Sequence, residues 1–201
     1  MDTKPYAVER EIEDLQAIVQ ATNETPFICG ISSGAVILMQ AASKGLHAKK
    51  IALFEPPYVV VNENDPAPPP DAKKTLEALV DQGQRSKAVS YFMSKVMGMP
   101  AIFVFLFKTF GGKMFRKNES VAHTLAYDVA ILGNFSLPVD MASKINLPVI
   151  VIGGEKSPLK LRNAVKKVGQ TISNAETSWL KGQTHNVSMK MLAPVLINYF
   201  K

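Results

Sequence analysis

Residues 27–45 read FICGISSGAVILMQAASKG. Three apolar residues of strand type lead into a Gly-Ile-Ser-Ser-Gly turn, and a long apolar segment of helical type then ends at Gly45. A strand that passes through so tight a turn into a helix places Ser32 at the sheet edge with its hydroxyl exposed. Gly30 and Gly34 lack side chains, so we expect neighbouring backbone to approach closely at both. The stretch predicts an α/β fold with a candidate nucleophile at this turn.

The helix that begins near Ser33 would direct its first backbone N–H groups toward the Ser32 hydroxyl. Such groups stabilise a negative charge that develops beside them, so the Ser33 N–H is the predicted oxyanion donor. The G-x-S-x-G pattern is short enough to occur by chance in a glycine- and serine-rich turn. The flanking strand and helix favour the nucleophile-elbow interpretation over that simpler one.

The composition is that of an ordinary globular protein. The chain has 201 residues, of which 47% are hydrophobic and 20% charged, and its formal net charge is +6. This length allows one domain with a sizeable core. The lysines are scattered, so we expect no nucleic-acid partner. The single Cys29 cannot form an internal disulfide, and residues 1–15 contain no apolar signal region, which together predict a cytoplasmic location.

Residues 96–110, VMGMPAIFVFLFKTF, form the most apolar segment of the chain. The segment is too short to span a bilayer comfortably, and it contains Gly98, Pro100 and Lys108. We therefore expect no membrane span, and we interpret the segment as a buried or pocket-lining helix.

Strand-type and helix-type segments alternate along most of the chain. The predicted strands are residues 27–29, 48–54, 147–152 and 176–180. Such an order predicts the α/β class, with a parallel sheet of about four strands flanked by helices. Residues 1–61 and 138–201 would form the two parts of this core.

Residues 62–137 differ from both flanking parts. They begin with a proline-rich linker and contain no convincing strand, so we interpret them as an all-helical lid; the alternative is a helical half of the core. Gly111 and Gly112 predict a break within this part. Asn118 predicts the start of a helix over residues 119–132.

A serine hydroxyl is a weak nucleophile and needs an adjacent base. Of the three histidines, His47 lies in a polar turn and His123 lies inside a predicted helix of the lid. His185 follows the last predicted strand in a Gly-Gln-Thr-His loop, at the end of the sheet where parallel strands place their chemistry. Its position late in the chain fits the order serine, acid, histidine, so we predict His185 as the base.

The third member would be a carboxylate that holds the imidazole in one tautomer. The loop after the third predicted strand has Ser157 where an acid is usual, with Glu155 two residues earlier. Glu55 ends the second predicted strand on the same side of the sheet as the serine, and Asp128 lies on a helix of the lid. We rank Glu55 first, Asp128 second and Glu155 third. The alternative for Glu55 is a carboxylate that only caps a turn.

These stretches resemble the α/β-hydrolase superfamily, specifically its small bacterial members with a helical lid. The resemblance rests on PYAVEREIEDL, GISSG, LFEPP, HTLAYD, GGEKSP and GQTHNV followed by LAPVLINYF, in the same order as in that group. It implies a serine hydrolase that cleaves a small or lipophilic ester through an acyl-enzyme, with Ser32 as nucleophile, His185 as base, and no cofactor or metal. GGEKSP departs from the usual acid, but some lidded relatives place the carboxylate after the preceding strand, as at Glu55.

Members of that superfamily begin with several strands and a helix before the segment that resembles residues 6–21. This chain starts after them, so we expect an N-terminally truncated fold with an exposed sheet edge at residues 27–29. Unpaired edges invite strand pairing, so the chain would self-associate or bind a partner there. The alternative function is a non-catalytic or partner-dependent hydrolase-like domain.

Overall fold

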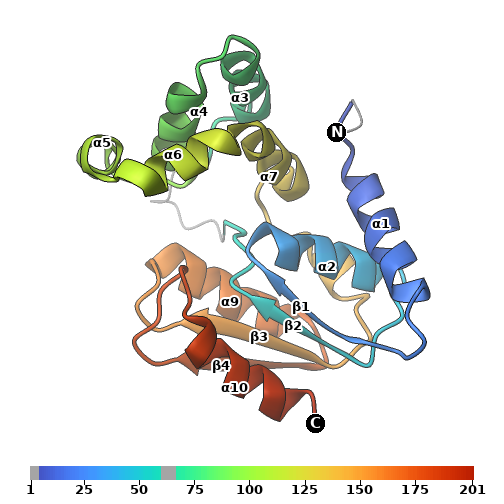
Figure 1. The fold of residues 1–201 in the computed structure, drawn as a ribbon. Helices are drawn as coiled ribbons and strands as arrows, with labels where there is room; N and C mark the ends of the chain where they lie inside the picture. The colour runs from blue at the N-terminus through green and yellow to red at the C-terminus, as the bar shows by residue number, and fades with distance from the viewer. Residues whose placement is uncertain (1–4, 60–66) are drawn as a thin grey trace. The chain divides into compact units, whose positions relative to one another are not determined.

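The computed structural model describes residues 5–59 and 67–201. It consists of two units, which we describe separately. The core unit comprises Ala7–Val60 and Ser136–Lys201, and the helical unit comprises Met1–Tyr6 and Val61–Phe135. Residues 60–66, which the sequence assigned to the end of the first core part and the start of the proline-rich linker, lie outside the described residues. Every described strand belongs to the core unit (Figure 1).

The core unit is built on a parallel four-stranded sheet with the order β1-β2-β3-β4. The strands are β1 (Phe27–Ile31), β2 (Lys50–Phe54), β3 (Val149–Gly154) and β4 (Ala175–Leu180). Ile28 lies opposite Ile51, which lies opposite Val149. Helical connections join the strands, as parallel pairing requires. The predicted α/β class and parallel sheet are confirmed.

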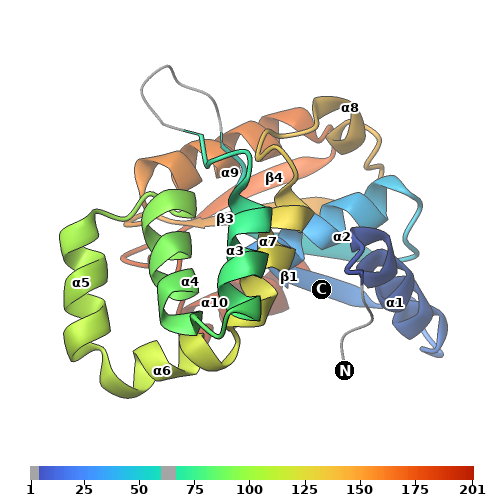
Figure 2. The ribbon, with the colours of Figure 1, turned by 90° about the horizontal axis from the view of Figure 1, so that it is seen from above.

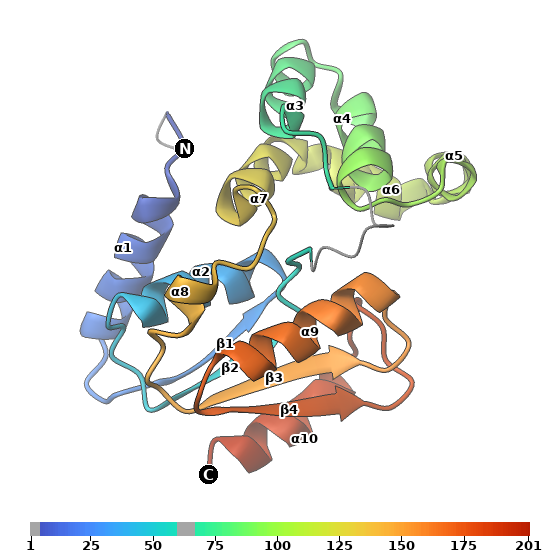
Figure 3. The same cartoon turned by 180° about the vertical axis from the view of Figure 1, so that it is seen from behind.

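Helices cover both faces of this sheet (Figure 3). One face carries α1 (Val8–Gln20), α2 (Ser33–Ser43), α8 (Val139–Ala142) and α9 (Leu159–Thr171), and the other carries α10 (Met189–Tyr199). Under α10, alternate residues of β2 and β3 form an apolar cluster with Leu180 and Leu192. The two central strands are therefore buried on both sides, which explains their nearly continuous apolar sequences.

Strand β1 lies at the edge of the sheet and pairs only with β2 among the described residues. The Ser32 N–H donates to the Phe54 carbonyl at 2.9 Å. Since backbone groups alternate in direction along a strand, those of Phe27, Cys29 and Ile31 point away from β2. A groove of about 330 Å³ runs along this edge between β1, α1 and α2. The described structure thus has the exposed edge that the sequence predicted, while self-association stays a prediction.

The helical unit contains only helices within its described residues (Figure 2). They are α3 (Ala72–Asp81), α4 (Arg85–Tyr91), a π-helical turn (Phe92–Val96), α5 (Ala101–Phe110), α6 (Gly112–Ser120), a 3₁₀ turn (Ala122–Thr124) and α7 (Leu125–Leu132). The ring of Tyr6 stacks on that of Tyr127 with 4.1 Å between centroids. This contact joins the N-terminal segment to the unit.

The predicted helix start at Asn118 is wrong. Asn118 lies inside α6, where its side-chain amide donates to the Met114 carbonyl at 3.0 Å. Helix α6 begins directly after the predicted break, at Gly112. The chain turns tightly at Gly111, where a Cβ would lie 2.2 Å from the Phe107 carbonyl oxygen. Gly112 has φ +45°, a value that favours glycine.

Of the two alternatives predicted for residues 96–110, a buried or a pocket-lining helix, the first does not hold for α5 (Ala101–Phe110). Val104 is the one buried residue of α5, and most of its large apolar side chains are exposed. The pocket-lining part of the prediction is confirmed, because Val104, Phe105 and Lys108 line a cavity of about 590 Å³ within the helical unit. Within the described residues, no helix is both long and apolar enough to cross a bilayer.

Candidate active site

Ser32 occupies a strained turn between β1 and α2. Its φ of 56° and ψ of −125° are unusual for a residue with a side chain, and such strain concentrates at functional sites. The turn depends on Gly30, where a Cβ would lie 2.6 Å from the Gly34 carbonyl oxygen and 2.7 Å from the Ala35 Cα. The expectation for Gly34 is wrong, since a Cβ there would meet nothing within 4 Å.

Three side chains of the core unit form a continuous hydrogen-bonded chain. His185 Nε2 lies 3.1 Å from Ser32 Oγ, and His185 Nδ1 lies 2.8 Å from Glu55 Oε2. The residues follow β1, β2 and β4 at the carboxyl ends of these strands, where α/β sheets commonly hold their sites. The contact expected between Glu55 and His185 is therefore present.

The Glu55 carboxylate is fully buried, at 0% exposed. Burial raises the pKa of Glu55, but the hydrogen bond with His185, the polar Ser157 hydroxyl beside the carboxylate, the hydrogen bond from the Gly154 N–H and the positive charge of a protonated His185 together outweigh burial, so the pKa lies below its usual value. The Gly154 N–H donates to Glu55 Oε1 at 2.7 Å. Ser157, also buried, lies beside the carboxylate without a hydrogen bond of good geometry.

The lowered pKa of Glu55 indicates the direction of its hydrogen bond with His185. An ionised carboxylate only accepts, so His185 Nδ1 carries the proton that faces Glu55. In the neutral imidazole Nε2 is then the acceptor, and the Ser32 hydroxyl donates to it. This arrangement leaves Ser32 Oγ ready to lose its proton to His185.

The close packing around the Glu55 carboxylate depends on glycine at position 154. The sequence alone did not point to this role of Gly154. A Cβ at Gly154 would lie 2.5 Å from the Gln183 carbonyl oxygen and 2.9 Å from Ser157 Oγ. The paired glycines at the end of a buried strand were the available signal, because glycine inside a strand often marks a close backbone approach. Glu55 itself has φ +45°, which indicates that its surroundings impose a strained backbone.

The other candidate residues lie elsewhere. Asp128 belongs to α7 of the helical unit, and His123 belongs to its 3₁₀ turn. Glu155 is exposed just after β3. His47 is exposed and its Nε2 lies 2.8 Å from the Thr25 hydroxyl. Within the core unit, Glu55 is the candidate acid that is hydrogen-bonded to His185 in the described structure.

The Ser33 N–H opens α2 and has no acceptor among the described residues. Free N–H groups at a helix N-terminus suit an oxyanion. The described residues contain no cluster of three or more histidine, cysteine or acidic side chains that could hold a metal ion.

The chain is similar to several solved structures. An α/β hydrolase from Sphaerobacter thermophilus is 42% identical, with a TM-score of 0.89, and the match covers 100% of this chain and 77% of that one. A hydrolase from Oleispira antarctica is 17% identical, with a TM-score of 0.67 and coverage of 98% and 76%. A putative lipase from Acinetobacter baumannii is 16% identical, with a TM-score of 0.62 and coverage of 100% and 69%.

No protein-family profile and no curated protein sequence matches the chain. The similarities to the Oleispira antarctica and Acinetobacter baumannii proteins, both below 25% identity, support only the fold assignment. The similarity to the Sphaerobacter thermophilus protein extends over the whole of this chain and most of that protein. The chain therefore belongs to the α/β-hydrolase family.

Proposed function

We propose that the chain is a serine hydrolase that cleaves small or lipophilic esters through an acyl-enzyme. Ser32 is the nucleophile, His185 the general base and Glu55 the orienting acid. The observation that carries the proposal is the hydrogen-bonded chain from Ser32 Oγ through His185 to Glu55, at 3.1 and 2.8 Å. Such a chain is the arrangement by which an unreactive hydroxyl is activated.

In the first half-reaction, Ser32 Oγ attacks the ester carbonyl carbon while His185 Nε2 takes the hydroxyl proton. The negative charge moves to the carbonyl oxygen, where the Ser33 N–H donates to it. The carbon–oxygen bond to the alcohol then breaks, and His185 returns its proton to the leaving alcohol. Throughout, the Glu55 carboxylate stabilises the imidazolium.

In the second half-reaction, water replaces the alcohol. His185 takes a proton from the water, whose oxygen attacks the acyl carbon and forms a second oxyanion at the same position. When the bond to Ser32 Oγ breaks, His185 returns the proton to the serine, and the carboxylic acid leaves. We also propose that the helical unit acts as a lid and that the chain works in the cytoplasm.

Labelling with a fluorophosphonate probe tests the nucleophile. The wild-type protein should be labelled, and Ser32→Ala should lose the label while keeping its circular dichroism spectrum. Ser43→Ala, at the other end of α2, is the matched control and should be labelled like the wild type. Labelling that survives in Ser32→Ala would rule out this residue, and an unlabelled wild type would favour the non-catalytic alternative.

We further propose that the free edge of β1 mediates self-association. Phe27 is 40% exposed on this strand, and the edge carries backbone groups that point away from β2. Phe27→Lys should shift the protein toward the monomer, because a lysine on an edge strand opposes pairing. Light scattering over a concentration series would measure the change, and a wild-type protein that is monomeric throughout would contradict the proposal.

A further inference from the structure

Helix α5 and the start of α6 expose an unusual amount of apolar surface. The exposed side chains are Met97, Ile102, Phe103, Phe105, Leu106, Phe110 and Met114, at 41–78% exposed. We call these residues the apolar patch. Solitary exposed apolar residues are common, but seven large ones between residues 97 and 114 indicate an interaction surface. Figure 2 shows α5 at the outer side of the helical unit, beyond α4 and α6.

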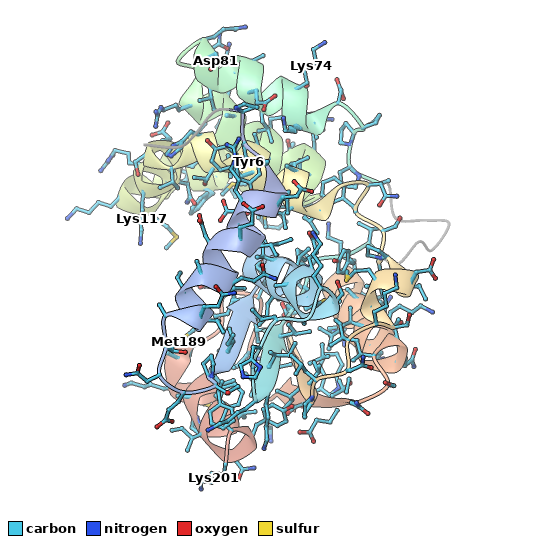
Figure 4. The ribbon with its side chains drawn as sticks, turned by 90° about the vertical axis from the view of Figure 1, so that its right-hand side faces the viewer. Tyr6, Lys74, Asp81, Lys117, Met189 and Lys201 are labelled. Carbon is cyan, nitrogen blue, oxygen red and sulfur yellow. The ribbon has the colours of Figure 1, made fainter. Side chains whose placement is uncertain are left out.

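The same segment is strongly basic. Residues 95–117 contain Lys95, Lys108, Lys113, Arg116 and Lys117 and no aspartate or glutamate. Within the described part of the chain, none of these five cations forms an ion pair. Figure 4 shows Lys117 at the periphery of the helical unit. From Lys95 to the end of α6 at Ser120, the segment that carries the patch thus holds five cations and one carboxylate, Glu119.

The two helices are held in a defined hairpin. The rings of Phe107 and Phe115 pack edge to face with 5.7 Å between centroids, and Phe115 is buried. The turn at Gly111 is too tight for any side chain, since a Cβ would lie 2.2 Å from a backbone oxygen. The hairpin can therefore present its apolar and basic residues together without first having to fold.

We propose that the α5–α6 hairpin docks on the surface of an anionic lipid bilayer. The apolar patch would enter the boundary between headgroups and acyl chains, while the five cations would face the lipid phosphates. Phenylalanine, leucine and isoleucine beside lysine and arginine form the usual composition of a helix that lies in a membrane interface. The hairpin adds attraction to anionic lipids, which depends on charge and is screened by salt.

The positive charge favours an anionic bilayer over a second copy of the same patch as the binding partner of this surface. Two copies would bring ten cations together with only two carboxylates from residues 95–120, the two Glu119 side chains. Like charges held close together oppose association. A bilayer with anionic headgroups supplies the complementary charge and an apolar interior at the same time.

Co-sedimentation of the full-length protein with vesicles tests the proposal. The probe vesicles are an equimolar mixture of phosphatidylcholine and phosphatidylglycerol, and the comparison vesicles are phosphatidylcholine alone. The wild type should bind the mixed vesicles at least about tenfold more tightly, and added salt should weaken this binding. Equal affinity for both vesicles, or no binding to either, would overturn the proposal.

Two matched pairs of variants locate the surface. Phe103→Ser/Phe110→Ser should weaken binding by about 100-fold or more, because two large apolar side chains no longer leave water. Ile18→Ser/Ile197→Ser, which alters exposed apolar residues of the core unit, should bind like the wild type. Circular dichroism would verify that both variants remain folded.

A second matched pair of double variants tests the contribution of the positive charges. Lys113→Gln/Lys117→Gln should weaken binding by about tenfold. Lys166→Gln/Lys167→Gln on α9 removes the same charge from the core unit and should have little effect. If both pairs weaken binding equally, the attraction comes from overall charge, and the hairpin proposal fails.

Two further outcomes would assign the apolar patch to another occupant. If Phe103→Ser/Phe110→Ser changes ester hydrolysis in the absence of vesicles, the patch belongs to the substrate site. If it converts a dimer into a monomer, the patch binds a second copy. Either result would overturn the membrane proposal without affecting the assignment of Ser32, which the labelling experiment tests separately.

Discussion

Helices α2 and α5 are both mainly apolar, yet α2 is largely buried and α5 is largely exposed. In α2 six residues are buried, whereas in α5 only Val104 is. Within the core unit, α2 contacts β1, β2, α1 and α8, and within the described helical unit α5 contacts α6 and the π-helical turn. In α2 the buried residues include three alanines, whereas Phe103, Phe105 and Phe110 of α5 are exposed. Apolar composition sets how much a helix can bury, but the neighbouring elements decide how much it does.

The largest contrast between the two regions should be catalytic. Glu55→Gln keeps the shape of the side chain but removes the charge that holds the His185 tautomer, so kcat should fall about 10⁴-fold. Asp128→Asn, in the helical unit, is the matched change at the other candidate acid and should leave kcat near the wild-type value. Steady-state hydrolysis of a p-nitrophenyl ester measures both. A reversed pattern would move the orienting role to Asp128.

Matched leucine substitutions compare the burial of the two helices directly. Leu38 in α2 is 1% exposed and Leu106 in α5 is 41% exposed. Leu38→Ala should lower the free energy of unfolding by about 2–5 kcal/mol, because it leaves a cavity in a packed core. Leu106→Ala should cost less than about 1 kcal/mol, since the side chain already meets water. Urea denaturation followed by circular dichroism provides both values, and similar losses would mean that α5 is buried in solution.

The two glycines of the Ser32 turn should respond differently to alanine. Gly30→Ala forces a Cβ to within 2.6–2.8 Å of the backbone of Gly34 and Ala35, so it should destabilise the core unit by about 1–3 kcal/mol. Gly34→Ala adds a methyl group to open space in a helix, where alanine is favoured by about 1 kcal/mol. The melting temperature should fall for the first and hold or rise for the second. Equal losses would show that the pattern needs both glycines.

The smallest effect should be a pH dependence of stability that arises from Glu55. Its pKa is lower in the folded protein than in the unfolded chain, so the ionised form favours folding. This contribution is present above the unfolded-chain value of about 4.3 and is lost as the pH falls through the lower folded value. Glu55→Gln should therefore flatten the acid side of the stability profile. If Glu55→Gln leaves the slope of unfolding free energy against pH unchanged below about 4.3, the pKa of Glu55 is not shifted by folding.

Much of the site could be predicted because its signals are local. The strand, the Gly-Ile-Ser-Ser-Gly turn and the apolar helix lie within residues 27–45, so their pattern alone specifies the turn that holds Ser32. Glu55 could be ranked but not chosen, because three carboxylates remained possible. Its contacts with His185 and Gly154 join residues 130 and 99 positions apart, a separation at which sequence spacing carries no geometry.

By itself, the sequence determined the α/β class, the parallel sheet and the tight turn at Ser32, since alternation and periodicity reflect local backbone preferences. Only the tertiary structure decided that Glu55 is held by His185 and Gly154, and that the apolar side chains of α5 face water. Both outcomes depend on which distant segments come together. A residue's own chemistry makes it able to be buried or ionised, but its neighbours in space supply the hydrogen bonds and contacts that settle the result.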